Sequence, residues 1–308
     1  MRIQIDENGY HTMTLKAGVI VKSIGGLYTV EAPEGIYECK ARGIFRNRDI
    51  SPCCGDRVDI ECDSSGNIIT AIYERKSHII RPPLSNLDQL VYVASISQPN
   101  PNLLLIDKFI AISEFKGISP VVVITKIDLS NFEEIVSVYE KAGITAFAVN
   151  NLTGEGTDTV LEILKGKFSA FTGNTGVGKS SLLNNILPEG DIQTGEISKK
   201  LGRGRHTTRH VELYKLGADT YIADTPGFST FETQKYDIIF KDELASCFRD
   251  FSKYEGECRF PDCSHTKEKG CAVIDAVKSG EIAKSRHDSY VQMYEEAKLL
   301  KEWEHKKQ

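Results

Sequence analysis

The sequence lacks the features of a membrane or secreted protein. Its 308 residues contain no apolar run long enough to span a bilayer, and Met1 to Glu7 lack the apolar core of a secretory signal. Internal repeats and low-complexity tracts are absent, which excludes a repeat architecture. Eight cysteines without a secretory signal fit a reducing compartment, in which thiolates bind metal instead of forming disulfides. We therefore expect a cytoplasmic protein with no membrane partner.

The chain also lacks the net positive charge that is typical of nucleic-acid-binding proteins, because its formal net charge is −5. One stretch, residues 199–210, is nevertheless strongly basic and contains no acidic residue. A local patch of this kind matters more for binding than the total charge. The charge balance therefore leaves RNA as a candidate partner. The length suits two or three modules, and 40% apolar content is enough for their buried cores.

Residues 173–180 match a complete phosphate-binding loop of the pattern G-x-x-x-x-G-K-[ST]. In such a loop the glycines let backbone N–H groups surround an anion, Lys179 reaches the outer phosphates and the Ser180 hydroxyl meets Mg²⁺. A strand-like stretch, 167–172, enters the loop, and a helical pattern, 181–187, follows with its N-terminus facing the phosphates. The expected phosphate-side residues are Gly173, Asn174, Thr175, Gly176, Val177, Gly178, Lys179, Ser180 and Ser181.

A second phosphate-side motif, Asp224-Thr225-Pro226-Gly227, follows the strand-like residues 220–223. Asp224 at a strand end can hold Mg²⁺ through water, and the Gly227 N–H can sense the γ-phosphate. The D-x-x-G pattern is common, but its distance from the phosphate loop, with the basic stretch between, makes it convincing. A threonine of that stretch, Thr208 in preference to Thr207, is expected to contact Mg²⁺ and the γ-phosphate. The alternative is an ordinary solvated basic loop.

Two loops with the chemistry of guanine recognition lie upstream of the phosphate loop. In the first, 125–128, Asp128 can accept two hydrogen bonds from the guanine N1–H and exocyclic amine, and the Lys126 stem can lie along the ring. Thr125 stands where asparagine is usual. The second loop contains Asn150 and Asn151 where a Ser-Ala pair is usual, and the Asn151 N–H can approach the guanine carbonyl. Each loop follows an apolar strand-like run, at whose carboxyl end α/β sheets bind ligands.

Residues 1 to about 80 contain five short alternating runs with glycine turns, which predict a small β-barrel. The runs are 18–21, 27–30, 36–39, 57–60 and 68–72. No stripe of aromatic residues or arginines marks this region as an RNA surface, so a β-domain that merely packs on its neighbour is the alternative. The region also contains Cys39, Cys53, Cys54 and Cys62 at irregular spacing and without a histidine among them. We expect buried thiols, with a second metal site as the alternative.

Three cysteines and a histidine fall within fourteen residues near the other end: Cys258, Cys263, His265 and Cys271. They supply a closed tetrahedral Zn²⁺ shell with no vacant position for water, which indicates a structural site; unliganded thiols are the alternative. Helical patterns flank them at 242–248 and from about 286 to 303. In the second of these helices, a stripe of mainly apolar residues lies on one face. We expect it to pack within the chain; a surface for a partner is the alternative. The stripe consists of Tyr290, Met293, Tyr294, Ala297 and Leu300.

The order of the motifs is the reverse of that in Ras-like GTPases, because both guanine loops precede the phosphate loop. The chain resembles the circularly permuted GTPases, and its two flanks make it similar over nearly its whole length to the small ribosomal subunit biogenesis GTPase family, often called RsgA. The resemblance implies an α/β fold with three domains. An OB-fold barrel (1–82) contacts RNA, a circularly permuted Ras-like GTPase domain (83–232) follows it, and a helical zinc-binding domain (233–308) comes last.

Phe228 stands where Ras-like GTPases place a water-orienting glutamine, so unaided hydrolysis should be slow. By resemblance, His206 is the candidate in this chain for the missing catalytic group, beside Thr208 and Gly227; a contact of His206 with RNA phosphate is the alternative. The expected partners are GTP, GDP and the small (30S) ribosomal subunit with its rRNA. The expected cofactors are Mg²⁺ with GTP and one structural Zn²⁺ per chain. We expect the protein to be a monomer.

The resemblance thus implies an enzyme that hydrolyses GTP, assists late maturation of the small subunit and is stimulated by it. A rival interpretation is an RNA-binding module for which GTP is only a conformational ligand, with negligible turnover. Phe228 keeps this rival open.

Overall fold

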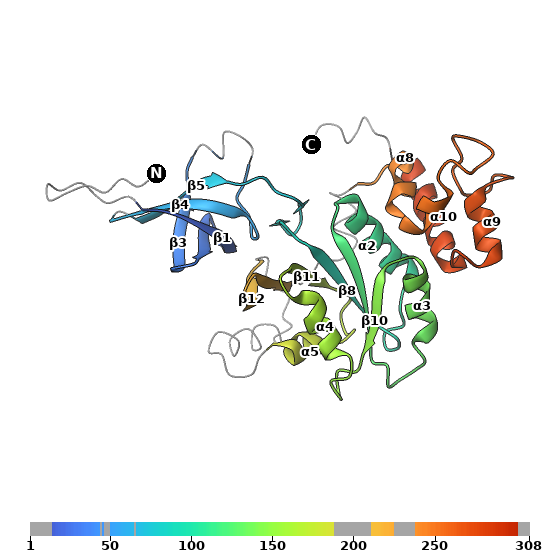
Figure 1. Ribbon diagram of the computed structural model, residues 1–308, viewed down its shortest axis with the longest axis horizontal. Coiled ribbons are helices and arrows are strands. Elements are labelled where there is room, and N and C mark those ends of the chain that lie inside the picture. Colours follow the sequence, from blue (N-terminus) through green and yellow to red (C-terminus); the bar gives the residue numbers. More distant parts are fainter. Residues whose placement is uncertain are drawn as a thin grey trace. The chain divides into compact units, whose positions relative to one another are not determined.

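The computed structural model describes residues 14–43, 45, 50–64, 66–187, 211–224 and 238–300 (Figure 1). The chain divides into two compact units that alternate along the sequence. The first contains residues 1–88, 164–170 and 203–226, and the second contains residues 89–163, 171–202 and 227–308. None of the helices among the described residues is both long and apolar enough to cross a bilayer.

Five strands of the first unit close a barrel in the order β1-β2-β3-β5-β4. Their bounds are Thr14–Ile24 (β1), Leu27–Ala32 (β2), Gly35–Ala41 (β3), Arg57–Asp63 (β4) and Gly66–Ile72 (β5). All five runs predicted from the sequence form strands. Neighbours pair antiparallel, except that β3 and β5 run parallel. The strands bury alternate side chains, so Ile20, Val30, Val58, Ile60 and Ile69 fill the interior. A short two-stranded sheet of β6 (His78–Ile79) and β7 (Leu84–Ser85) follows.

A six-stranded sheet has the order β10-β9-β8-β11-β13-β12. The strands are β8 (Gln89–Ser95), β9 (Ser119–Thr125), β10 (Thr145–Val149), β11 (Phe168–Thr172), β12 (Leu213–Gly217) and β13 (Thr220–Asp224). Strands β8, β9 and β10 are parallel, and Thr125 lies opposite Ser95 on one side and Val149 on the other. The carboxyl ends of these three strands are therefore level, and the loops that leave them start side by side.

Helices connect these strands, as a doubly wound α/β domain requires: α2 (Leu103–Phe115), α3 (Glu133–Lys141), α4 (Thr157–Leu164) and α5 (Lys179–Ile186). Helix α2 begins at an Asn102 cap, whose side chain accepts a hydrogen bond from the Leu105 N–H over 3.1 Å. It is buried along much of its length, so it packs on the sheet with one side and on the C-terminal helices with another.

The C-terminal part of the second unit is helical: α8 (Lys241–Leu244), the 3₁₀ helices η1 (Ala245–Cys247) and η2 (Arg249–Tyr254), α9 (Ala272–Ser279) and α10 (Lys284–Lys298). The helix predicted at 242–248 is thus a short α-helix that continues as a 3₁₀ turn. Helix α10 ends at Lys298, earlier than predicted. Of the predicted stripe, Tyr290, Met293 and Ala297 are buried within the chain, whereas Leu300 lies beyond the helix end and is 37% exposed.

A buried ion-pair network joins α10 to α2 and η2. The Arg286 guanidinium donates to Asp107 and to Asp250, each over 2.8 Å, and its side chain is only 1% exposed. It also lies over the Phe248 ring, 4.6 Å from the centroid. Two carboxylates around one guanidinium offset the cost of burying the charge, and loss of one partner would leave an uncompensated buried charge. The network therefore fixes the C-terminal helices against α2.

Candidate functional site

The phosphate loop lies between β11 and α5, so the strand and helix predicted around it are both present. Its two end glycines adopt left-handed backbone conformations at φ +154° and +89°. A Cβ at Gly173 would lie 2.2 Å from the Val93 carbonyl oxygen, and one at Gly178 would lie 2.9 Å from Asn151 Nδ2. Only glycine fits at either position. Gly178 precedes α5 without a capping side chain, which leaves the helix N-terminus to an anion.

The first guanine loop contacts the phosphate loop directly through Thr125. This residue ends β9 and is fully buried. Its hydroxyl faces the carbonyl oxygens of Ala94, at 3.2 Å, and of Val177, to which it makes a shorter hydrogen bond. Because its hydroxyl faces these two carbonyls, Thr125 links β9 to the phosphate loop, and its place among the nucleotide-binding residues stays a prediction. The threonine that replaces the usual asparagine thus retains a polar link between the two loops.

Lys126 and Asp128 leave the carboxyl end of β9 together. Lys126 adopts φ +57°, is half-buried, and donates a hydrogen bond from Nζ to the Gln98 carbonyl. The Asp128 carboxyl group lies on the exposed side of the same turn, which closes through a 3.0 Å bond from the Leu129 N–H to the Lys126 carbonyl. The turn therefore directs an acceptor outward beside a half-buried lysine stem, as the guanine-reading role requires.

The second guanine loop uses its two asparagines in different ways. Asn150 is buried and shapes the loop, because its Oδ1 accepts the Leu152 N–H over 2.9 Å. Asn151 reaches the phosphate loop, where its Nδ2 donates to the Gly178 carbonyl over 3.0 Å, and its own carbonyl accepts from Asn185 Nδ2 over 2.9 Å. The sequence predicted a role only for the Asn151 N–H and did not reveal this side-chain link. An amide in place of a small Ser-Ala pair was the available signal.

The structure therefore brings the two guanine loops and the phosphate loop together within the second unit. Asp224 ends β13, and nothing is described of its side chain. The remaining predicted residues lie outside the described residues: His206, Thr207, Thr208, Gly227 and Phe228. Their roles stay predictions.

The Cys258, Cys263, His265 and Cys271 side chains converge on one point, with all four ligand atoms within 4.8 Å of one another. Cys258 Sγ lies 3.5 Å from His265 Nδ1 and 3.8 Å from Cys271 Sγ, and His265 Nδ1 lies 3.4 Å from Cys271 Sγ. In a tetrahedron with metal–sulfur bonds of about 2.3 Å, neighbouring ligands are about 3.7 Å apart. Three soft thiols and one imidazole at this spacing fit Zn²⁺ and leave no open coordination position.

Hydrogen bonds hold the loop between these ligands in shape. Glu268 accepts from the backbone N–H groups of Ser264, Thr266 and Lys267 over 3.0 to 3.1 Å. Burial would raise the pKa of Glu268, but hydrogen bonds from the Ser264 hydroxyl and from the backbone N–H groups of Lys267, Glu268 and Ser264 outweigh it and lower the pKa to about 2. The Tyr290 hydroxyl of α10 donates to the Ser264 carbonyl over 2.9 Å. Such outer contacts orient metal ligands before the metal arrives.

The barrel cysteines are mostly buried, as expected. Cys39, Cys53 and Cys54 are at most 3% exposed, and burial raises the pKa of each thiol to about 12. Cys54 donates a hydrogen bond to the Val211 carbonyl over 3.1 Å. Cys62 differs from the prediction, because it is only half-buried. Thiols held in their protonated form pack as small apolar groups.

The order of these elements along the chain defines the class of protein. One mixed sheet carries all four motifs at the ends of its strands: the guanine loops after β9 and β10, the phosphate loop after β11 and an aspartate at the end of β13. This order is that of a circularly permuted P-loop GTPase. Two solved structures have the same fold. YjeQ from Thermotoga maritima matches with a TM-score of 0.79 at 33% identity, covering 94% of this chain and 100% of that one. YloQ, described as a circularly permuted GTPase, matches with a TM-score of 0.75 at 30% identity, covering 92% and 96%.

Sequence comparisons narrow the class. The family model RsgA GTPase matches residues 72–234, and the RsgA N-terminal domain model matches residues 17–69. The small ribosomal subunit biogenesis GTPase RsgA of Alkaliphilus metalliredigens is 41% identical over 290 residues, which are 92% of this chain and 98% of that protein. The protein of the same name from Caldanaerobacter subterraneus subsp. tengcongensis is 43% identical over 285 residues, or 91% and 95%. The chain therefore belongs to the RsgA GTPase family, whose members hydrolyse GTP.

Proposed function

We propose that this GTPase binds the small (30S) ribosomal subunit late in assembly, is stimulated by it and leaves after hydrolysis. The relatives named as small ribosomal subunit biogenesis GTPases support this role, because they match more than nine-tenths of the chain. The role implies a cytoplasmic protein whose partners are GTP, GDP and the subunit with its rRNA.

One observation carries the nucleotide-binding part of the proposal. Thr125 and Asn151, one from each guanine loop, both make hydrogen bonds to the backbone of the phosphate loop. A base held by the guanine loops and phosphates held by the phosphate loop would thus share one rigid frame. We assign Lys126, Asp128 and the Asn151 N–H to guanine, and residues 173–181 to the phosphates and, through Ser180, to Mg²⁺.

The hydrolytic step is attack of water on the γ-phosphate, which yields GDP and phosphate. Mg²⁺, held by Ser180, Asp224 and Thr208, would neutralise charge that develops on the phosphate oxygens. The Gly227 N–H would contact the γ-phosphate. Because Phe228 cannot orient water, we assign that task to His206 in a state that the ribosomal surface stabilises. The subunit would thereby act as the activator.

The flanking modules would supply the ribosomal contacts. We assign residues 1–82 to an OB-fold barrel that contacts rRNA, residues 83–232 to the GTPase domain and residues 233–308 to the zinc-binding domain. The Cys258, Cys263, His265 and Cys271 set fits Zn²⁺, which when bound would crosslink the loop from 258 to 271. These four side chains would fix that loop without taking part in hydrolysis.

Co-sedimentation with purified small subunits tests the ribosomal role. We expect the protein to pellet with small subunits when loaded with a non-hydrolysable GTP analogue and to pellet less with GDP. Lys179→Ala, which weakens phosphate binding, should lose the difference between the two nucleotides. Failure to pellet with both the GTP analogue and GDP would contradict the ribosomal part of the proposal while leaving GTP hydrolysis intact.

A further inference from the structure

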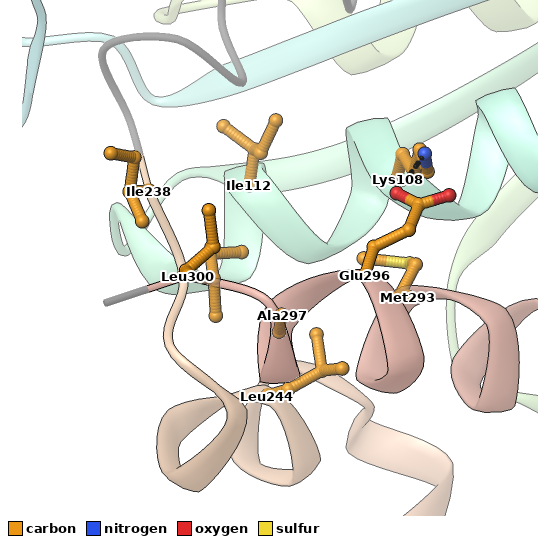
Figure 2. Close-up of a pocket in the computed structure, with 9 residues that line it drawn as sticks. Lys108, Ile112, Ile238, Leu244, Met293, Glu296, Ala297 and Leu300 are labelled. Carbon is orange, nitrogen blue, oxygen red and sulfur yellow. Dashed lines mark hydrogen bonds and ion pairs between the residues drawn. The ribbon is translucent and has the colours of Figure 1, made fainter. Parts of the chain in front are cut away.

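An apolar groove lies between helices α2, α8 and α10 of the second unit (Figure 2). Its volume is about 160 Å³, and its walls include Ile112, Ile238, Leu244, Met293, Ala297 and Leu300. Figure 2 shows Lys108 of α2 and Glu296 of α10 facing each other at the end opposite Ile238, where their side chains form a 2.6 Å ion pair. The groove is thus apolar along its length and carries an ion pair at one end.

The final described residue of the chain forms part of this groove. Leu300 lines it and is 37% exposed, and the sequence continues with eight residues, 301–308. The third of them, Trp303, is the single tryptophan of the protein. Three residues span at most about 10 Å even when fully extended. The indole is therefore tethered close to the groove by a very short connection.

The chemistry of the groove matches an indole side chain. A closed aliphatic cavity of about 150 Å³ accommodates a benzene ring; this groove of about 160 Å³ is open to solvent and lined mainly by aliphatic residues, so it can receive one ring of the larger indole while the other stays at the opening. A buried indole also needs an acceptor for its N–H. The Glu296 carboxylate at the rim supplies one, and its side chain is 47% exposed, so it can still take a further hydrogen bond.

We propose that this groove is the docking site of the chain's own C-terminal segment, 301–308, and that the inserted group is Trp303. The short tether gives Trp303 a far higher effective concentration at the groove than any separate partner has. The indole would cover Met293 and Ala297 on α10 and Ile112 on α2, and so add to the contacts that hold the C-terminal helices. A second copy of the chain or another protein is the competing occupant, and either would leave Trp303 in solvent.

Trp303 reports its own environment, because no other tryptophan contributes to the fluorescence. We expect the emission of the native full-length protein to be blue-shifted, and its quenching by acrylamide to be severalfold weaker, than in the same protein unfolded in guanidinium. Emission and quenching equal to those of the unfolded protein would overturn the proposal.

Two variants locate the docking site. Ala297→Met fills the groove and should increase the quenching of Trp303 toward the unfolded value, whereas Glu295→Met, at an exposed position of the same helix, should not. In Trp303→Ala, added free indole should bind and raise the melting temperature, with no rise in the wild type. Unchanged quenching in a folded Ala297→Met protein, or equal effects of indole on both proteins, would place Trp303 elsewhere and contradict the proposal.

Discussion

At the residue scale, the buried hydroxyl of Thr125 links the predicted guanine loop to the phosphate loop. It contacts the carbonyl of Val177, which lies 52 residues later in the sequence. Thr125→Val keeps the shape of the side chain and leaves the Val177 carbonyl without this donor, which costs about 1–3 kcal/mol. We expect GDP affinity to fall by roughly one to two decades, as measured by titration with a fluorescent nucleotide. Thr125→Ser keeps the hydroxyl and is the matched control; affinity unchanged in Thr125→Val would contradict the role.

Asp128 is the residue that we propose to determine base selectivity. In Asp128→Asn the new amide places a donor where guanine also has one, whereas xanthine presents a carbonyl there. An unpaired polar group in the base pocket costs about 1–3 kcal/mol, or roughly one to two decades of affinity. Titration of the variant with guanosine and xanthosine nucleotides should show the preference reversed. Wild-type affinity for GTP in this variant would mean that residues 125–128 do not read the base.

The guanine loops could be predicted from the sequence, whereas the contacts that join them to the phosphate loop could not. Asp128 could be assigned because a buried run of residues ends directly before its motif, and the chemistry of the motif is local. The Asn151 side chain donates to Gly178, 27 residues away, so its partner depends on how the sheet brings the loops together. No pattern within either loop specifies that partner.

At the element scale, the loop between η2 and α9, which contains the four cysteine and histidine ligands, has little regular structure. Its fold therefore depends on the metal that these ligands bind. We expect about one zinc per chain by metal analysis. Chelation, or Cys258→Ala, should lower the melting temperature of the protein, because binding of a structural zinc contributes directly to folding. Ser279→Ala, on neighbouring α9, is the control. Zinc-free protein with an unchanged melting transition would contradict a structural metal.

The hydrogen bonds of Glu268, which hold that loop in shape, lead to a separate prediction. The two oxygens of the Glu268 carboxylate accept hydrogen bonds from three backbone N–H groups. Glu268→Gln replaces one of these oxygens by an NH₂ group, which cannot accept. We expect weaker zinc retention against a competing chelator, by about 10- to 100-fold, which is typical for the loss of an outer contact. Glu257→Gln, exposed beside the same loop, should retain the metal as the wild type does. Equal retention in both variants would remove Glu268 from the support of the site.

Element boundaries depended on what packs around them. The sequence pattern predicted the final helix to about residue 303, because apolar residues recur at helical spacing up to Leu300. Helix α10 ends at Lys298, and the two residues after it, Leu299 and Leu300, are exposed. The helix changes to a 3₁₀ turn at Ala245, and Cys247 and Phe248 of this stretch lie in the buried core. Periodicity alone does not encode that change.

At the scale of the whole molecule, the order of motifs was sufficient to predict a permuted GTPase, because each motif comes directly after its own strand. The Arg286 network was not predictable, since its partners Asp107 and Asp250 lie 179 and 36 residues away. Arginine at a helical position usually indicates a solvated face. Only the fold shows that this one is buried between α2, η2 and α10.

The central claim is that the small subunit activates hydrolysis. Phosphate release at saturating GTP, with and without purified small subunits, tests it most directly. We predict acceleration of at least ~10-fold, because a partner must order the water-positioning groups that Phe228 cannot replace. The acceleration should fall steeply with salt, since basic contacts to rRNA phosphates release counterions. His206→Ala and Thr208→Ala should lose the stimulation, and Thr207→Ala should keep it. A wild-type rate that is the same with and without small subunits would contradict the account.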